Sequence, residues 1–341
     1  MKLSHNSQAN LPLGLFFPLL LVLASFPRSA QGEQPSAVFS WHDTPGKFTE
    51  LRFGDRPVVR YMYRALDEST PEARQETYKP YHHVFAPDGS RLLTKGPGGL
   101  YPHHRGLFYG FRLVTYDDGK TCDSWHMING SYQAHDAVLE QAADQNQARH
   151  RVAILWHADN GVTYAREERE LIVSQPTHHG VQGTLIEFRS HMTPVGDKPI
   201  HLDGDPQHAG FQFRAAQEVA ASTKGQTYYL RTDGRGALGE TRNWNPADPH
   251  DPVNAECTNR PWNAMSFVVG GQRYTALYLD HPSNPKPARY SERDYGRFGS
   301  YFVADVTQDK PLDIKYRVWV QEGEMTVDQC KALSREFVSA H

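Results

Sequence analysis

Residues 151–173 read RVAILWHADNGVTYAREERELIV, and this stretch decides the fold class. Two runs rich in apolar and β-branched residues, Arg151 to His157 and Val162 to Val173, flank Asn160-Gly161. Asn-Gly is the strongest two-residue signal for a β-hairpin, because both central positions of a type I′ turn need a positive φ. The stretch therefore predicts a pair of antiparallel strands.

The same pattern recurs elsewhere in the chain. Three further turn signals, Gly54-Asp55, Pro87-Asp88-Gly89 and Gly270-Gly271, each separate two short apolar runs. Apolar residues alternate with polar ones over residues 312–320, which is typical of a half-buried strand. Many short strands with turns between them predict an all-β fold, here a large antiparallel β-sandwich. The expected strand pairs are residues 48–53 with 58–63, 83–85 with 91–94, 151–157 with 162–173, and 266–269 with 274–279.

Helical signals are few. Residues 69–77 could form one or two turns. At the C-terminus, Thr326 and Gln329 make a capping box, which satisfies the free N–H groups at a helix start. A short C-terminal helix is expected there, with one apolar face made by Val327, Cys330, Leu333 and Phe337.

Two long stretches, residues 231–263 and 281–299, are rich in Pro, Asn, Asp and Arg and lack clear strand character. We interpret them as loops. Loops of that length within a compact domain are usually functional or disordered.

The first residues have the pattern of a signal peptide. Lys2 is followed by an apolar run from Leu11 to Leu23 and then by Ala30-Gln31-Gly32, a small-x-small cleavage pattern. The run is shorter than the roughly 20 residues of a membrane span. We expect residues 1–32 to be a signal peptide and residues 33–341 to form one β-sandwich domain, periplasmic or secreted, with no membrane span after cleavage.

Composition and missing motifs exclude several classes of function. The formal net charge is −3 and no block of basic residues occurs, so a nucleic-acid partner is not expected. The chain has no H-E-x-x-H, Walker, G-x-G-x-x-G, G-x-S-x-G or C-x-x-C pattern, which removes the basis for metalloprotease, NTPase, dinucleotide-dependent and serine-hydrolase functions. The three cysteines, Cys122, Cys257 and Cys330, match no zinc motif and allow one disulfide at most; buried free thiols are expected, with the pairing left open.

Eighteen histidines make their placement informative, and the first cluster is Tyr101-Pro102-His103-His104-Arg105-Gly106. Adjacent histidines on an extended segment point to opposite faces, so at most one should face a given pocket. Arg105 can hold a carboxylate or two hydroxyls in its planar fork, and Gly106 allows close backbone approach. His83 could join this cluster. A structural turn with satisfied histidines is the alternative interpretation.

Two further clusters follow. In residues 207–214, strand alternation puts His208, Gln212 and Arg214 on one side and phenylalanines on the other, which fits either a wet cleft or a solvated outer face. The third cluster lies after an expected strand, where loops held by a sheet often carry function, although a plain surface loop would look the same. Its candidate residues are Asp280, His281, Asn284, Arg293 and Tyr295. Trp125, between Asp123 and His126, adds a possible stacking platform beside a possible acid.

At these clusters the chain resembles the exported bacterial proteins called PmoA-like, or "methane oxygenase PmoA". The resemblance covers most of residues 45–322, and it departs from the family pattern at Asp123-Ser124-Trp125 and at Tyr290-Ser291. Methane oxidation is not expected, because membrane methane monooxygenase needs several spanning helices. The segment around His103 also resembles the histidine-containing strand of galactose-mutarotase-like proteins, which implies a supersandwich that binds sugars in an open cleft. The matching residues are Lys79-Pro80-Tyr81, His83, Pro102 to Leu107, His208-Ala209-Gly210, Gln212-Phe213-Arg214, Asp280 to Asn284, and Arg293 to Gly296.

The resemblance and the residues together favour a carbohydrate-active enzyme that uses acid–base chemistry on a sugar or oxidised sugar, as an epimerase, lyase or hydrolase. His104 or His208 would donate the proton and Asp280 would be its partner or base. The expected binding residues are His83, His103, Arg105, Trp125, Gln212, Arg214, His281, Asn284, Arg293 and Tyr295.

Two alternatives stay open. One is a non-catalytic protein that binds a small sugar or an oligosaccharide in the same cleft. The other is a divalent-metal enzyme, with the ion held by His83, His103 or His104, and His208, because neutral imidazoles suit zinc, copper, nickel or iron. No other cofactor is expected.

Overall fold

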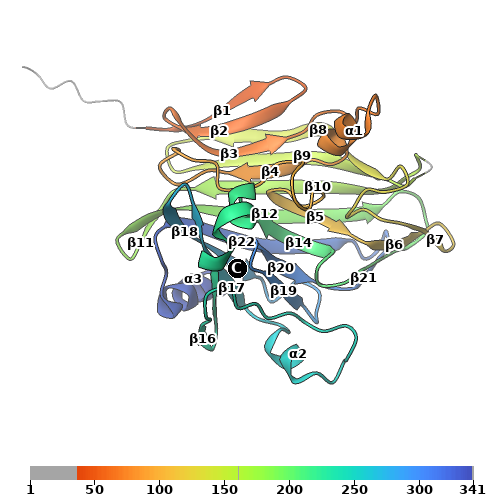
Figure 1. The fold of residues 1–341 in the computed structure, drawn as a ribbon. Helices are drawn as coiled ribbons and strands as arrows, with labels where there is room; N and C mark the ends of the chain where they lie inside the picture. Colours follow the sequence, from red (N-terminus) through yellow and green to blue (C-terminus); the bar gives the residue numbers. More distant parts are fainter. Residues whose placement is uncertain (1–36, 160, 340–341) are drawn as a thin grey trace, which may run out of the picture. The chain divides into compact units, whose positions relative to one another are not determined.

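A computed structural model describes residues 37–159 and 161–339. The expected signal peptide, residues 1–32, lies outside the described residues. Within the described residues the chain forms two large antiparallel sheets, one small sheet and three α-helices (Figure 1). No helix in this part of the chain is both long and apolar enough to cross a membrane.

One large sheet has eight strands in the described part of the chain, and every neighbouring pair is antiparallel. Its strands come from the first third, the middle and the last part of the chain. In spatial order the strands are β1 (Phe39–Thr44), β2 (Phe48–Phe53), β3 (Arg56–Met62), β4 (Tyr81–Val84), β5 (Leu107–Phe111), β14 (Ala209–Arg214), β20 (Arg297–Tyr301) and β19 (Arg289–Arg293).

The other large sheet has ten strands among the described residues, again paired antiparallel. In order they are β16 (Gly234–Arg235), β15 (Tyr228–Arg231), β17 (Trp262–Val269), β18 (Gln272–Asp280), β22 (Leu312–Glu322), β12 (Val181–Pro194), β10 (Thr163–Ser174), β9 (Gln147–His157) and β8 (Tyr132–Ala143), with β11 (Thr177–His178) beside β12.

The remaining elements are short. The small sheet contains β21 (Ala304–Val306), β13 (Ile200–Asp203), β6 (Leu113–Tyr116) and β7 (Lys120–Cys122). The α-helices are α1 (Pro71–Thr77), α2 (Pro252–Glu256) and α3 (Val327–Ser339), and a π-helical turn (Val219–Thr223) runs into a 3-10 turn (Lys224–Gln226).

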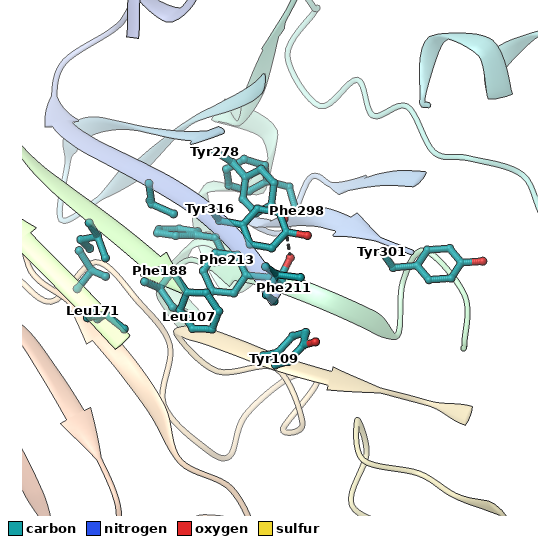
Figure 2. Packing of buried hydrophobic residues seen from close by; sticks show 14 of the residues in the cluster. Leu107, Tyr109, Leu171, Phe188, Phe211, Phe213, Tyr278, Phe298, Tyr301 and Tyr316 are labelled. Carbon is teal, nitrogen blue, oxygen red and sulfur yellow. Dashed lines mark hydrogen bonds between the residues drawn. The ribbon is translucent and has the colours of Figure 1, made fainter. Parts of the chain in front are cut away.

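The two large sheets pack face to face over an aromatic core. Phe188 of β12 stacks on Phe211 of β14 with ring centroids 4.2 Å apart, and Tyr316 of β22 lies 5.1 Å from the same ring (Figure 2). All three side chains are fully buried. Burial of each such ring contributes on the order of 1.5–3 kcal/mol, so this layer joins the sheets into one sandwich.

The predicted all-β class, antiparallel sandwich and short C-terminal helix are confirmed. The hairpin read from residues 151–173 is the β9–β10 pair, and the pairs β2–β3 and β17–β18 lie where the turns predicted them. The capping box forms as expected, since Thr326 N–H donates to Gln329 Oε1 and Gln329 N–H donates to Thr326 Oγ1. The three cysteines are buried and free.

Both stretches expected to be loops contain regular elements, and residues 231–263 include β16 and α2. Residues 281–299 are not one long loop, because they contain β19 and the start of β20. These strands carry buried polar side chains and so lack the apolar alternation of ordinary strands: Arg297 donates to Ser291, and Glu292 accepts from Arg231 and Arg260. The hairpin expected around Pro87-Asp88-Gly89 forms as a short antiparallel pair, in which Leu93 N–H donates to Val84 O and Ala86 N–H donates to Arg91 O on either side of the Phe85–Leu92 bridge.

Candidate metal centre

Three imidazoles converge above the outer face of the eight-stranded sheet. One ring nitrogen from each of His103, His126 and His208 lies within 4.8 Å of the other two. The ring centroid of His126 lies 4.6 Å from that of His103 and 4.8 Å from that of His208. The three side chains are half-buried, so the cluster is reachable from solvent.

His126 is oriented by a carboxylate three residues earlier. Asp123 follows β7, and its Oδ1 accepts hydrogen bonds from the backbone N–H groups of Trp125 (2.9 Å) and His126 (2.7 Å). The other carboxylate oxygen, Oδ2, lies 2.7 Å from His126 Nδ1. Burial would raise the pKa of Asp123, but the hydrogen bonds and charge of His126 keep that pKa below its ordinary value.

His208 is held in the same way. Asp205 lies in the loop between β13 and β14, and both of its carboxylate oxygens are 3.0 Å from His208 Nδ1. Its Oδ1 also accepts from the backbone N–H of Gln207. Burial would raise the pKa of Asp205, but His208, that N–H and Arg112 hold the pKa well below its ordinary value. With Nδ1 occupied in both His126 and His208, Nε2 remains as the free nitrogen of each ring.

His103 comes from a turn that folds back along β5. The segment is not extended as the sequence suggested, because Tyr101 has a φ of 54° and its carbonyl accepts from His104 N–H at 3.0 Å. The rings of His103 and His104 therefore lie on the same side, 4.2 Å apart, rather than on opposite faces. Gly106 ends the turn with a φ of 48°, at a position where a Cβ would be 2.0 Å from His82 O.

The ring nitrogens of His103 and His104 need partners. His103 Nε2 is buried and has no hydrogen-bond partner among the described residues. Burial, with Lys79 and His126 nearby, lowers the pKa of His103 to about 2, so the ring is neutral and can donate a lone pair to a metal. Both nitrogens of His104 are likewise buried without a partner, although its ring stacks 6.4 Å from His208 and 6.3 Å from Tyr295.

Comparison with known proteins identifies the family. Residues 49–335 match a family of unknown function, DUF6807. The chain belongs to this family. No curated protein matches it.

Several solved structures are similar to this DUF6807 chain. They include the protein HI1317 (8% identity, TM-score 0.31, covering 83% of this chain and 99% of the other). They also include a galactose mutarotase related enzyme from Lactobacillus acidophilus (9% identity, TM-score 0.32, 72% and 95%) and a polysaccharide lyase (10% identity, TM-score 0.32, 88% and 34%).

In this member of the DUF6807 family, five of the residues expected from the sequence lie at or beside the cluster. His103 and His208 belong to it, and His104 contacts it. Trp125 is fully buried and packs against Phe108 and the ring of His104, so it offers no exposed ring face on which a sugar could stack. Tyr295 stacks on Tyr101 at 4.4 Å, next to His104.

The side chains of Arg105 and Gln212 form hydrogen bonds within the protein. Arg105 donates to the backbone carbonyls of Gln75 and Glu76 and lies 4.3 Å from the ring centre of Tyr78. Gln212 accepts from Arg297 Nη1 at 3.0 Å and donates to Ala209 O. All of β14 is buried, so the solvated outer face considered for this strand does not occur.

Other expected residues have their contacts elsewhere. Both nitrogens of His83 have partners, Tyr81 Oη at 3.2 Å and Thr94 Oγ1 at 3.1 Å, and the third histidine of the cluster is His126 instead. Arg293 donates to Asn243 Oδ1 at 2.6 Å.

The side chains of the loop that begins at Asp280 also make their contacts away from the histidine cluster. Asp280 binds Asn284 Nδ2 (2.6 Å) and Lys286 Nζ (2.7 Å), and burial raises its pKa. His281 lies 5.0 Å from Phe337 of α3.

Sequence reasoning missed the roles of His126, Asp123 and Asp205. A signal was present, because Asp123-Ser124-Trp125-His126 and Asp205-Pro206-Gln207-His208 share the pattern Asp-x-x-His. In both, the aspartate caps the turn and orients the imidazole three residues later.

Proposed function

We propose that this protein is a metal-dependent enzyme acting on a carbohydrate, with one divalent first-row metal ion held by His103, His126 and His208. The observation that carries the proposal is the convergence of these three imidazole nitrogens within 4.8 Å. Three histidines with open remaining positions are the ligand set of catalytic zinc sites, and imidazole also suits copper, nickel and iron.

The surroundings of the cluster support a metal site. Metal-binding histidines nearly always donate their second N–H to a carboxylate or carbonyl, which fixes the tautomer and makes the ligand more basic. Asp123 and Asp205 occupy that position for His126 and His208. The unpartnered Nε2 of His103 supplies the third donor, and a buried polar atom without a partner otherwise costs stability.

The chemistry follows from the open positions. A bound metal ion would act as a Lewis acid on a hydroxyl or carbonyl oxygen of the substrate. His104 lies next to the cluster with both ring nitrogens free, so it can hydrogen-bond to a substrate atom beside the metal ligands. In this proposal His104 contacts the reacting group of the substrate. His208 becomes a metal ligand, in place of the proton-donor role considered from the sequence.

A carbohydrate substrate rests on the sequence resemblance described above and on the polar character of the site. The test is a screen of neutral sugars, uronic acids, aldonic acids and keto-sugars with the purified protein, with products followed by NMR. The proposal predicts turnover that disappears after treatment with a chelator and returns with one added divalent metal. Turnover that persists in the metal-free protein would refute it.

A further inference from the structure

The cluster is surrounded by more buried cationic side chains than its two carboxylates, Asp123 and Asp205, can balance. Five cationic side chains are 3% exposed or less and have no ion pair within residues 37–159 and 161–339: Lys79, Lys95, Arg105, Arg214 and Arg297. Other buried arginines are paired, as Arg169 is with Glu167 and Arg231 with Glu292. An uncompensated buried charge is costly, so an imbalance confined to one place indicates an anion that binds there.

Three of the five cations are occupied by backbone carbonyls. Lys79 Nζ donates to Trp125 O at 2.6 Å, and Lys95 Nζ donates to Gly96 O at 2.9 Å. Arg105 donates to the end of α1, as described above. Burial, together with Arg214 and Arg105, lowers the pKa of Lys95 to about 7. Burial also lowers the pKa of Lys79 well below its ordinary value, so the two lysines add little positive charge near neutral pH, and the donors of all three side chains are largely used.

Arg214 is different, because one complete edge of its guanidinium is free. Nη1 donates to the carbonyl of Tyr295, whereas Nε and Nη2 are buried and have no partner among the described residues. Nε–H and Nη2–H point the same way and form the fork that binds a carboxylate through two parallel hydrogen bonds. The guanidinium carbon lies 5.0 Å from the ring centre of Tyr295, which fixes the plane of the fork.

Arg297 adds a second cation beside this edge. Its Nη1 and Nη2 bind Gln212 Oε1 and Ser291 Oγ, at 3.0 and 2.9 Å, and its Nε has no partner in the described structure. Burial and the charge of Arg297 lower the pKa of Arg214 to about 10, whereas Tyr295 and Tyr229 act in the opposite direction.

The free edge of Arg214 and the metal-binding histidines are linked by stacked rings. Tyr295 packs against Arg214 on one side and His104 on another, and His104 in turn packs against His208. Tyr101, 43% exposed, stacks on Tyr295 at 4.4 Å, so this stack of rings reaches the surface of the protein. Besides burial, the positive charges of Arg297 and Arg214 lower the pKa of His104, so the guanidinium of Arg214 and this histidine are neighbours at one site.

We infer that Arg214 binds a carboxylate of the substrate, which makes the substrate a sugar acid such as a uronic or aldonic acid. This inference rests on the proposed function for the sugar and for the neighbouring metal site. The carboxylate subsite itself depends on Arg214 and not on the metal.

The test measures binding of D-glucuronate, D-galacturonate and D-gluconate to metal-free and metal-loaded protein by calorimetry. Uncharged partners of similar shape, the methyl esters of D-glucuronate and D-galacturonate and the amide D-gluconamide, serve as matched ligands. We expect at least one acid to bind about tenfold or more tightly than its uncharged partner, since charge-assisted bidentate pairs are the strong hydrogen bonds. Arg214→Lys, which keeps the charge but loses the fork, should remove that preference while leaving metal content unchanged. Arg235→Lys, an exposed arginine, is the control variant.

Equal binding of every acid and its uncharged partner by the wild-type protein would overturn the inference, and this comparison needs no variant to fold. A preference that survives in Arg214→Lys would also overturn it, as would sulfate competing as well as the acids. If the proposed metal site is wrong but the carboxylate subsite is right, the experiment gives a different result. Acids would then bind in an Arg214-dependent way to a protein that takes up no metal.

Discussion

The Nδ1 atom of His126 lies 2.7 Å from Oδ2 of Asp123, and this contact leaves Nε2 as the free nitrogen of a ring that lies beside His103 and His208. Asp205 and His208 repeat the relationship in a loop that precedes a different strand. Two separate Asp-x-x-His turns thus present two imidazoles to one point, with a third histidine contributed by the turn before β5. This arrangement is the basis of the proposed metal site.

Replacement of Asp123 by Asn should weaken metal binding by about 10- to 100-fold, because the carboxylate that orients His126 and raises its basicity is lost. The measurement is the metal dissociation constant, obtained by competition with a chelating dye. Asp305→Asn is the matched control, since Asp305 makes the same 2.7 Å contact with Nδ1 of His201 outside the cluster. Equal affinities in the two variants would show that Asp123 does not act through a metal ligand.

Glu292 should be essential for stability. It is fully buried and accepts hydrogen bonds from Arg231 (2.6 Å), Arg260 (2.9 Å) and Asn263 (2.9 Å). Glu292→Gln leaves the buried guanidinium of Arg260 without its counter-charge and Arg231 with only the partly exposed Glu240, and should lower the free energy of unfolding by about 3–5 kcal/mol.

The control for Glu292 is an exposed pair. Glu324 lies 3.3 Å from Arg235 with both side chains about half exposed, so Glu324→Gln should change the free energy of unfolding by less than about 1 kcal/mol. Urea denaturation of both variants measures the difference. Similar midpoints would contradict the importance given to the Glu292 network.

His150 should make the protein less stable in acid. Burial, reinforced by His135, lowers its pKa to about 4, although Asp43 acts in the opposite direction. Between about pH 6.5 and 4 the unfolded chain binds a proton that folded His150 does not, so stability falls as the pH falls through this window. The contribution reaches about 3 kcal/mol at the acid end.

The measurement is the free energy of unfolding from pH 7 to 4 for wild type, His150→Gln and the surface variant His191→Gln. His150→Gln should flatten the dependence, because its side chain does not titrate, whereas His191→Gln should not. Parallel curves for all three proteins would show that His150 is not a buried neutral histidine.

Much of the fold could be predicted from local sequence. Hairpins depend on a few turn residues and on alternation, and both can be read over ten residues, as at residues 151–173. The pair β19–β20 could not be read in this way. Its polar side chains are buried by contacts from distant positions, such as Asn243 on Ser291 and Gln212 on Arg297, which no local pattern reveals.

The candidate site was only partly accessible to the same reasoning. His103 and His208 are conspicuous in their motifs, but their convergence depends on the pairing of β5 with β14, about a hundred residues apart in the chain. His126 carries the Asp-x-x-His pattern, but its place beside Trp125 favours a stacking interpretation of that segment. His83 was expected to join the first cluster, yet its nitrogens contact Tyr81 and Thr94.

The most direct test of the account is the metal content of protein purified without a histidine tag, then equilibrated with zinc and dialysed. The account predicts one ion per chain in the wild type, loss of that ion in His126→Ala, and its retention in His201→Ala, a histidine outside the cluster with its own carboxylate partner. Wild-type protein that retains no zinc, copper, nickel, iron or manganese, or a His126→Ala variant that binds metal as well as the wild type, would contradict it.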